Sequence, residues 1–113
     1  NRTGNGYVYS SRYIDKDAAE TELRTELGLL DSDVEARHLQ MKVGRVERSW
    51  VGNCLAVGLS QGFIEPLEAT ALHIVQATVE GFIGAYEGGG FTPEHRDAFN
   101  DRIARRYDGI RDY

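Results

Sequence analysis

The apolar positions of this chain recur at spacings that change from one segment to the next. Residues 7–14 are aromatic and β-branched and partly alternate with polar residues, which predicts a strand. Residues 15–28 instead carry Ala19, Leu23 and Leu27 at intervals of four, between an aspartate and a glycine, and this spacing predicts a capped helix. The first part of the chain is therefore expected to hold a strand followed by a helix.

The middle of the chain has the spacing of strands. In residues 37–43 apolar and polar positions alternate, as in a half-buried strand, and residues 45–51 resume that period of two. Residues 53–58 form a short continuous apolar run between an asparagine and a glycine, which is typical of a strand buried on both faces. We therefore expect this region to supply the sheet.

Helical spacing follows these strands. Residues 68–87 are predicted to form a long, well-buried helix, because their apolar positions recur every three or four residues. Residues 92–111 are predicted to form another helix, with Thr92 as N-cap and Pro93 in the first helical position. The chain is thus expected to be α/β or mixed α+β, with short strands before long helices. The apolar face predicted for helix 68–87 comprises Leu72, Val75, Val79, Phe82 and Tyr86, widened by Ala71, Ile74 and Ile83.

Length, charge and cysteine content narrow the class of protein. A chain of 113 residues fits one domain in size. The net charge of −5, from 13 basic and 18 acidic residues, argues against a general nucleic-acid-binding protein. The single cysteine, Cys54, excludes an internal disulfide framework and is typical of the reducing cytoplasm. No apolar run reaches 18 residues, so no membrane span is predicted.

The candidate chemistry lies in residues 58–72, GLSQGFIEPLEATAL. A buried strand that ends at Gly58 and leads into a helix near Thr70 places the helix N-terminus where α/β sheets bind ligands. The first N–H groups of a helix lack partners and attract anions. The helix dipole keeps Glu68 ionised, which suits a general base. The residues alone leave a simpler interpretation open, in which Glu68 is an acidic first-turn residue and Glu65 a solvated loop carboxylate.

The segment around this stretch resembles a known family. Residues 43–82, VGRVERSWVGNCLAVGLSQGFIEPLEATALHIVQATVEGF, resemble the flavin-dependent tryptophan halogenases, whose members carry a strand, the pattern G-[FL]-[ILV]-E-P-L-E-[SA]-T and a helix. Upstream, RTGNGYVYSSRYIDKDAAETEL resembles the family's G-x-G-Y-x-[FY]-S-S segment, and FNDRIARRYDGIRDY resembles the helix that follows. The resemblance covers nearly the whole chain and implies part of an FAD-dependent, monooxygenase-like fold.

The resemblance implies an enzyme that uses reduced FAD, oxygen and chloride or bromide to halogenate an electron-rich aromatic compound such as indole or tryptophan. A separate flavin reductase would supply the reduced FAD. Glu68 matches the catalytic glutamate of the family, and Thr70 and Ala71 match its halide-binding turn. The family's catalytic lysine has no counterpart here, since neither Lys16 nor Lys42 matches its motif. The residues expected to contact FAD are Gly58, Gly62, Phe63, Pro66, Leu67, Ala71 and Leu72.

The chain departs from the family pattern in ways that bear on this expectation. Ala69 replaces the usual serine, and Ala71 the usual glycine. An alanine N–H can bind halide as a glycine N–H does if φ stays negative, whereas loss of the serine hydroxyl makes free tryptophan a less expected substrate. The family's N-terminal G-x-G-x-x-G unit, which holds the FAD pyrophosphate, is missing. Residues 1–113 are therefore expected to be one internal piece of a larger catalytic domain, inactive alone.

Other interpretations stay open. A related flavin monooxygenase would hydroxylate or epoxidise its substrate without halide, and a non-catalytic flavin-binding or structural module would merely retain the motif. Packing alone also explains several conspicuous residues. Trp50 fits a packed strand position, Cys54 an inert core thiol, and the arginines of residues 102–106 a solvated helix face. The histidines lack the spacing of metal ligands.

Overall fold

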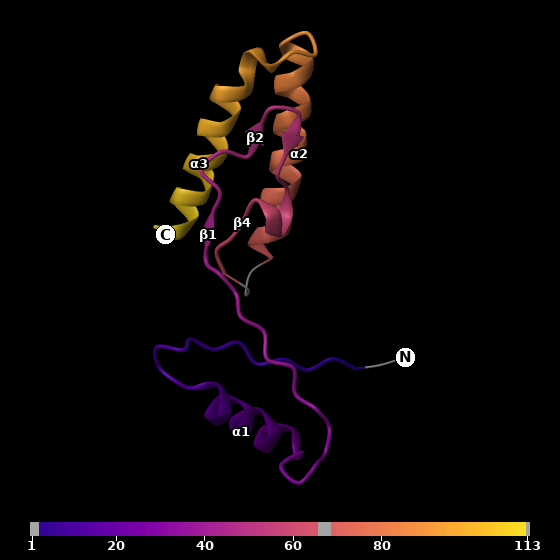
Figure 1. Cartoon of the computed structure of the whole chain (residues 1–113), viewed down its shortest axis with the longest axis vertical. Helices are drawn as coiled ribbons and strands as arrows, with labels where there is room; N and C mark the ends of the chain where they lie inside the picture. Colours follow the sequence, from indigo (N-terminus) through magenta and orange to yellow (C-terminus); the bar gives the residue numbers. More distant parts are fainter. Residues whose placement is uncertain (1–2, 66–68, 113) are drawn as a thin grey trace. The chain divides into compact units, whose positions relative to one another are not determined.

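The computed structural model describes residues 3–65 and 69–112, and its contacts group the chain into two compact units, residues 1–40 and 41–113. The described residues form helices and very short strands joined by irregular segments, which agrees with the mixed class expected from the sequence (Figure 1). The predicted site residues Pro66, Leu67 and Glu68 lie outside the described part.

The unit of residues 1–40 is built on helix α1 (Lys16–Leu27), which confirms the helix predicted there. Asp15 caps its N-terminus by accepting hydrogen bonds from two backbone N–H groups, which would otherwise lack partners. Gly28 ends it in the left-handed conformation, with φ of 67°. The guanidinium of Arg24 then donates to three backbone carbonyls of the following loop, and so holds that loop against the helix.

The strands predicted at residues 7–14 and 37–43 are absent, since the structure assigns no strand to either segment. A strand needs a neighbour that receives its backbone hydrogen bonds. Instead of pairing with a strand, these segments contact α1 through side chains. The Tyr7 hydroxyl donates to Glu22 at 2.6 Å, and the His38 ring lies 2.7 Å from Glu20. Residues 37–43 are all exposed, so their alternation of apolar and polar residues matches no buried face in this structure.

The unit of residues 41–113 is dominated by helices α2 (Thr70–Gly88) and α3 (Arg96–Arg111), which pack side by side (Figure 1). A 3-10 turn, η2 (Pro93–His95), leads into α3, and Thr92 caps it by accepting from the Glu94 N–H, as predicted. The helix expected at 68–87 begins at Thr70 and ends one residue later than predicted.

The strands of this unit are each two residues long. β1 (Gly44–Arg45) pairs antiparallel with β4 (Gly62–Phe63), and β2 (Trp50–Val51) pairs antiparallel with β3 (Cys54–Leu55). A 3-10 turn, η1 (Gly58–Ser60), separates β3 from β4. These pairs brace the loops that run alongside the helices.

The strand predicted at residues 53–58 is wrong in both length and burial. Only β3 is extended and paired there, and the Cys54 side chain is exposed, so it is no core thiol. The hairpin of β2 and β3 turns at Gly52, whose φ of 57° favours glycine. The apolar residues 55–57 that follow are half-buried, because this hairpin is covered on one side only.

The core of this unit forms where β2 meets both helices. Trp50 is 4% exposed, and its ring packs edge-on against Phe82 and Phe99 at centroid distances of 4.9 and 6.0 Å. The Asn100 side chain accepts from the Trp50 N–H and donates to the Trp50 carbonyl, so the backbone polar groups of the strand are satisfied by α3. The predicted packed position of Trp50 is confirmed.

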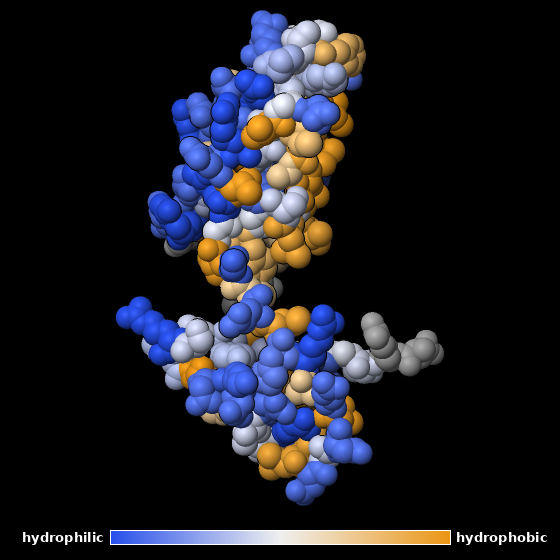
Figure 2. Space-filling view, viewed as in Figure 1, coloured by the Kyte–Doolittle hydropathy of each residue, from blue (hydrophilic) through white to orange (hydrophobic). Residues whose placement is uncertain are grey.

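Helix α2 packs through part of the face predicted for it, since Ile74 is buried and Phe82 and Tyr86 pack against the core. Ile74, Thr78 and Ala85 are its buried residues, whereas Leu72 and Val79 are exposed. Figure 2 shows hydrophobic side chains along the α2 side of this unit and polar ones along the α3 side. The helix is apolar over more of its circumference than α3 covers, so its periodicity could not tell which stripe packs inward.

Candidate functional site

A small hollow lies where the loop after η1 leads into the N-terminal end of α2. Its volume is about 10 Å³, which is room for one water-sized species. β4 and the first turn of α2 supply most of the wall, and α3 contributes one aromatic ring. The described residues that line it are Gly58, Gly62, Phe63, Ile64, Glu65, Thr70, Ala71, Ile74 and Tyr107.

Two residues of the first turn of α2, Thr70 and Ala71, line this hollow. Ala69 is the N-cap residue, and it has no side-chain oxygen with which to cap the helix. Its carbonyl accepts from the N–H of Leu72 at 2.9 Å. The N–H groups of Thr70 and Ala71 have no acceptor within the helix, because the first turn of a helix has none. Together with the helix dipole they favour a small anion.

Ala69 itself is held in a strained conformation. Its φ is 53°, in the left-handed region that costs a non-glycine residue about 1 kcal/mol. Backbone strain of this kind clusters at functional sites, where the surrounding structure enforces it. The strain falls between Glu68 and the first helical N–H groups, and so it marks the junction at which the sequence predicted chemistry.

The Thr70 hydroxyl is already engaged. It donates to a carboxylate oxygen of Glu65 at 2.7 Å, across the loop that joins β4 to α2. This bond ties the two ends of the loop together. Any anion at this turn would therefore be held by the backbone N–H groups, while the Thr70 side chain helps to fix the loop.

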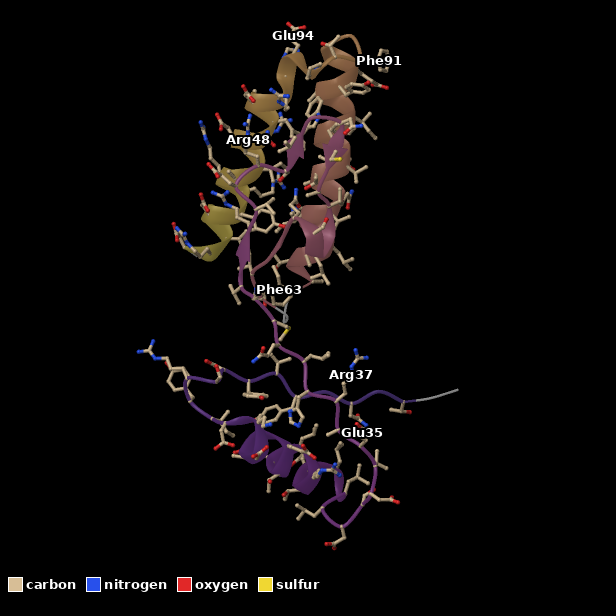
Figure 3. All side chains as sticks on the ribbon, in the orientation of Figure 1. Glu35, Arg37, Arg48, Phe63, Phe91 and Glu94 are labelled. Atoms are coloured by element: carbon tan, nitrogen blue, oxygen red, sulfur yellow. The ribbon has the colours of Figure 1, made fainter. Side chains whose placement is uncertain are left out.

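The structure gathers five of the predicted site residues around the hollow and separates one from it. Leu72 is 72% exposed and does not contribute to the wall. Phe63 lies at the end of the unit where α2 begins, and Phe91 lies at the opposite end (Figure 3). The predicted residues that line the hollow are Gly58, Gly62, Phe63, Thr70 and Ala71.

Two residues at this site were not singled out by the sequence. Tyr107 lies in the predicted helix 92–111, and its ring lines the hollow while its hydroxyl donates to the side chain of Gln61 at 3.2 Å. Burial raises the pKa of the Tyr107 hydroxyl, so it is protonated at neutral pH. Gln61 is 1% exposed, and its position in a polar-looking loop gave no sign of that burial.

An ion pair fixes β1 against α3 beside the hollow. The Arg45 guanidinium donates from two nitrogens to the two carboxylate oxygens of Asp108, at 3.1 and 3.0 Å. These hydrogen bonds hold the pKa of the Asp108 carboxyl below its ordinary value. Because β1 pairs with β4, this contact also restrains the strand that forms the wall of the hollow.

A larger hollow lies near the other end of α2, between the β2–β3 hairpin and the loop that leads to α3. It measures about 300 Å³ and is lined mainly by aromatic and aliphatic side chains. Phe91, in the left-handed region with φ of 63°, stands 5.5 Å from the Tyr86 ring between centroids. No predicted site residue belongs to it.

Metal and membrane sites receive no support from the described residues. Residues 3–65 and 69–112 contain no group of three or more His, Cys, Asp or Glu side chains that could hold a metal ion. Within the same ranges, no helix is both long and apolar enough to span a bilayer. The arginines of 102–106 lie on the outer side of α3, where Arg102, Arg105 and Arg106 are exposed, as predicted for a solvated face.

The fold and the hollow define a candidate small-anion site at a junction between loop and helix. Comparison with known proteins identifies the family in which this junction occurs. The model of the tryptophan halogenase family matches residues 1–113, and the chain therefore belongs to that family.

Individual relatives support the same assignment. The chain is 40% identical over 112 residues to the 7-chloro-L-tryptophan 6-halogenase KtzR of Kutzneria sp., which covers 99% of this chain and 22% of that protein. The solved structure of tryptophan 6-halogenase SttH from Streptomyces toxytricini matches 93% of this chain and 21% of its own, at 40% identity and a TM-score of 0.78. BrvH, a flavin-dependent halogenase from Brevundimonas sp. BAL3, matches 92% of this chain and 21% of its own, at 36% identity and a TM-score of 0.75.

These matches also set the extent of the resemblance. The chain spans about a fifth of the length of the relatives it matches. Its fold is accordingly that of one part of a flavin-dependent halogenase.

Proposed function

We propose that this chain supplies the halide-side loop of a flavin-dependent halogenase, which modifies an electron-rich aromatic compound such as an indole or a tryptophan. The observation that supports this most strongly is the water-sized hollow at the N-terminal end of α2, walled by Thr70 and Ala71 within the segment that carries the family's motif. A halide is a small anion, and an uncapped helix N-terminus favours such an ion.

The size of the hollow decides which of the expected ligands could enter it. A volume of about 10 Å³ suits one species close to the size of a water molecule, and a flavin ring or an indole is far larger. FAD would therefore lie against the outer side of the loop from Gly58 to Leu72, with Phe63 and Pro66 as further contacts. When bound in reduced form, FAD supplies the oxidising equivalents from oxygen that convert chloride or bromide into the halogenating species.

The chain's own groups have distinct proposed roles. The N–H groups of Thr70 and Ala71 would hold the halide, and Ala71 suits this role because it lies within α2, where φ is negative. Glu68 would accept the proton that leaves the aromatic ring after halogen addition, and a carboxylate beside a helix N-terminus is ionised at neutral pH. Glu65 would keep the loop closed through its bond to Thr70.

The substrate, partner and location belong to the same proposal. Ala69 lacks the hydroxyl of the serine that the family commonly has, so an indole-like compound other than free tryptophan is the expected natural substrate. A separate flavin reductase would supply the reduced FAD. The single cysteine, exposed in this structure, supports a reducing cytoplasm as the site of action. Residues 1–113 alone are expected to be inactive, because they lack the pyrophosphate-binding glycine motif and the lysine of the family.

Dependence on halide tests this function. The full-length enzyme would be supplied with flavin reductase, NADH, FAD, oxygen, indole and bromide, and the products analysed by mass spectrometry. The expected product carries the bromine isotope pair and disappears when halide is omitted. An oxygenated product that forms equally well without halide would contradict the proposal and support a monooxygenase.

A flavin-binding measurement made beside the activity assay tests the non-catalytic interpretation. If the full-length protein binds reduced FAD and yields no product with either halide, the non-catalytic interpretation gains. The same assay with chloride in place of bromide tests whether the loop accepts both ions, as the backbone N–H groups predict, since these groups have no strong preference for ion size.

A further inference from the structure

A buried amide stands at the centre of the unit of residues 41–113, and five hydrogen bonds converge on it. The side-chain oxygen of Gln61 accepts from the hydroxyls of Thr78 at 3.1 Å and Tyr107 at 3.2 Å. Its side-chain nitrogen donates to the Ser49 hydroxyl at 3.0 Å. Its backbone N–H donates to the Gly58 carbonyl, and its backbone carbonyl accepts from Val46, both within 3.0 Å.

These partners come from every element that surrounds the loop. Ser49 precedes β2, Thr78 belongs to α2, and Tyr107 belongs to α3. Three of the four side chains are less than 5% exposed, and Ser49 is 6% exposed. In so dry a setting, each hydroxyl that loses its partner is unsatisfied, so the arrangement tolerates little displacement. Gln61 therefore fixes the loop relative to both helices at once.

The residue next to Gln61 leaves no room for movement. A Cβ at Gly62 would stand 2.8 Å from the Gly44 carbonyl oxygen and 2.9 Å from the Tyr107 ring. β4 is thus pressed between β1 and α3 directly after the amide. The hollow at the N-terminal end of α2 begins at the same glycine, and the Tyr107 ring forms part of its wall.

We propose that Gln61 is a positioning residue, which, through Thr78 and Tyr107, holds residues 62–65 and the first turn of α2 in the geometry that the halogenation site requires. The catalytic consequence of this inference rests on the proposed function, whereas its structural consequence can be tested independently of that function. Gln61 touches no reacting atom in this scheme. It acts by setting where β4 ends and where α2 begins, and a displacement of about 1 Å at such a site can lower turnover on the order of 10²-fold.

The structural consequence is tested by hydrogen–deuterium exchange of the full-length enzyme. Thr78→Val removes one hydroxyl from the Gln61 oxygen and keeps the side-chain shape, whereas Thr78→Ser keeps the hydroxyl. We expect amides of residues 62–65 and 69–72 to exchange about 10-fold faster in Thr78→Val, with wild-type rates in Thr78→Ser. Equal rates in wild type and Thr78→Val would overturn the proposal, whether or not the enzyme halogenates.

The catalytic consequence is tested by steady-state kinetics of Gln61→Met and Thr78→Val with indole and bromide. We expect kcat to fall about 10- to 100-fold in Gln61→Met, with KM for indole changed by less than about 3-fold, because misplacement of the loop affects the reacting geometry more than substrate binding. Thr78→Ser should restore the kcat lost in Thr78→Val. This rescue distinguishes the hydrogen bond from general packing.

Asn100→Leu is the matched control. Asn100 is also a buried amide with two hydrogen bonds, but these go to Trp50 and reach none of residues 62–72. It should lower the melting temperature as Gln61→Met does and leave kcat per folded, FAD-binding enzyme unchanged. If Gln61→Met also lowers only the melting temperature, Gln61 is structural and the positioning role is wrong. If the wild type itself yields no halogenated product, the proposed function fails, and the exchange experiment still decides the role of Gln61.

Discussion

The two ends of α2 are held in place by different forces. At the N-terminal end, hydrogen bonds through Gln61 and Thr70 fix a glycine-containing loop around a hollow of about 10 Å³. At the C-terminal end, Trp50 packs against aromatic rings beside a hollow of about 300 Å³. Hydrogen bonds depend on angle as well as on distance, so the first end suits a site that must hold fixed geometry.

The contrast also shows why exposed apolar surface is a poor guide to the site in this chain. Most of the exposed hydrophobic residues of α2, and the larger hollow, lie away from the loop with the family motif. The candidate site is instead small and walled partly by backbone. The larger apolar hollow, which the usual first hypothesis favours, lies at the end of the helix away from the family motif.

The largest effect on stability is expected at the aromatic end. Trp50→Ala should lower the free energy of unfolding by about 3–5 kcal/mol, because it removes a buried ring that contacts both helices and leaves a cavity. Urea denaturation followed by circular dichroism measures this change. Phe91→Ala, at a ring that is 66% exposed, is the control and should have a much smaller effect. Equal losses in the two variants would contradict the packing described for Trp50.

Substitution of two glycines should change stability by smaller amounts and in opposite directions. Gly62→Ala should destabilise by about 1–3 kcal/mol, because its Cβ would meet backbone and the Tyr107 ring at under 3 Å. Gly109→Ala, in α3 with no described atom within 4 Å of its Cβ, should stabilise by up to about 1 kcal/mol through helix propensity. The Trp50 fluorescence of each variant during urea denaturation reports the change. A neutral Gly62→Ala would show that β4 can shift away from α3.

The smallest effect is expected from the ion pair beside the site. Hydrogen bonds from Arg45 lower the pKa of Asp108, so the folded state favours its ionised form. The stability that it contributes is present above the ordinary aspartate range, about pH 4, and is lost as the pH falls through the lowered pKa. Asp108→Asn should reduce the acid sensitivity of unfolding between about pH 5 and 2. An unchanged pH profile in this variant would mean that the pair adds nothing measurable to stability.

Local sequence signals predicted the helices of this chain well and its strands poorly. α1 has its own cap residues at both ends, Asp15 and Gly28, so its bounds could be read from nearby residues alone. Strand residues take their structure from a partner elsewhere in the chain. Residues 7–14 and 37–43 have strand-like composition and find no partner strand, so composition misled the prediction there.

The candidate site was likewise predicted where its residues are adjacent in sequence and missed where they are distant. Most of the residues that wall the hollow belong to one continuous motif, and five of the predicted residues meet there, because β4 and the start of α2 are adjacent in sequence. The bond between Gln61 and Tyr107 joins residues 46 positions apart, and no local pattern reports such a contact. The packing face of α2 was predicted in part: Ile74, Phe82 and Tyr86 pack inward, whereas Leu72 and Val79 are exposed, because apolar residues extend beyond the stripe that its neighbours cover.

The most direct test of the account compares the two glutamates of the motif in the full-length enzyme. Bromination of indole would be measured for wild type, Glu68→Gln and Glu65→Gln, with FAD binding as a control for folding. We predict a loss on the order of 10²-fold or more in kcat for Glu68→Gln. Glu65→Gln should stay within a few-fold of wild type, because the new amide oxygen can still accept the Thr70 hydroxyl. Full activity in Glu68→Gln with normal FAD binding would contradict the assignment of Glu68 as the catalytic carboxylate.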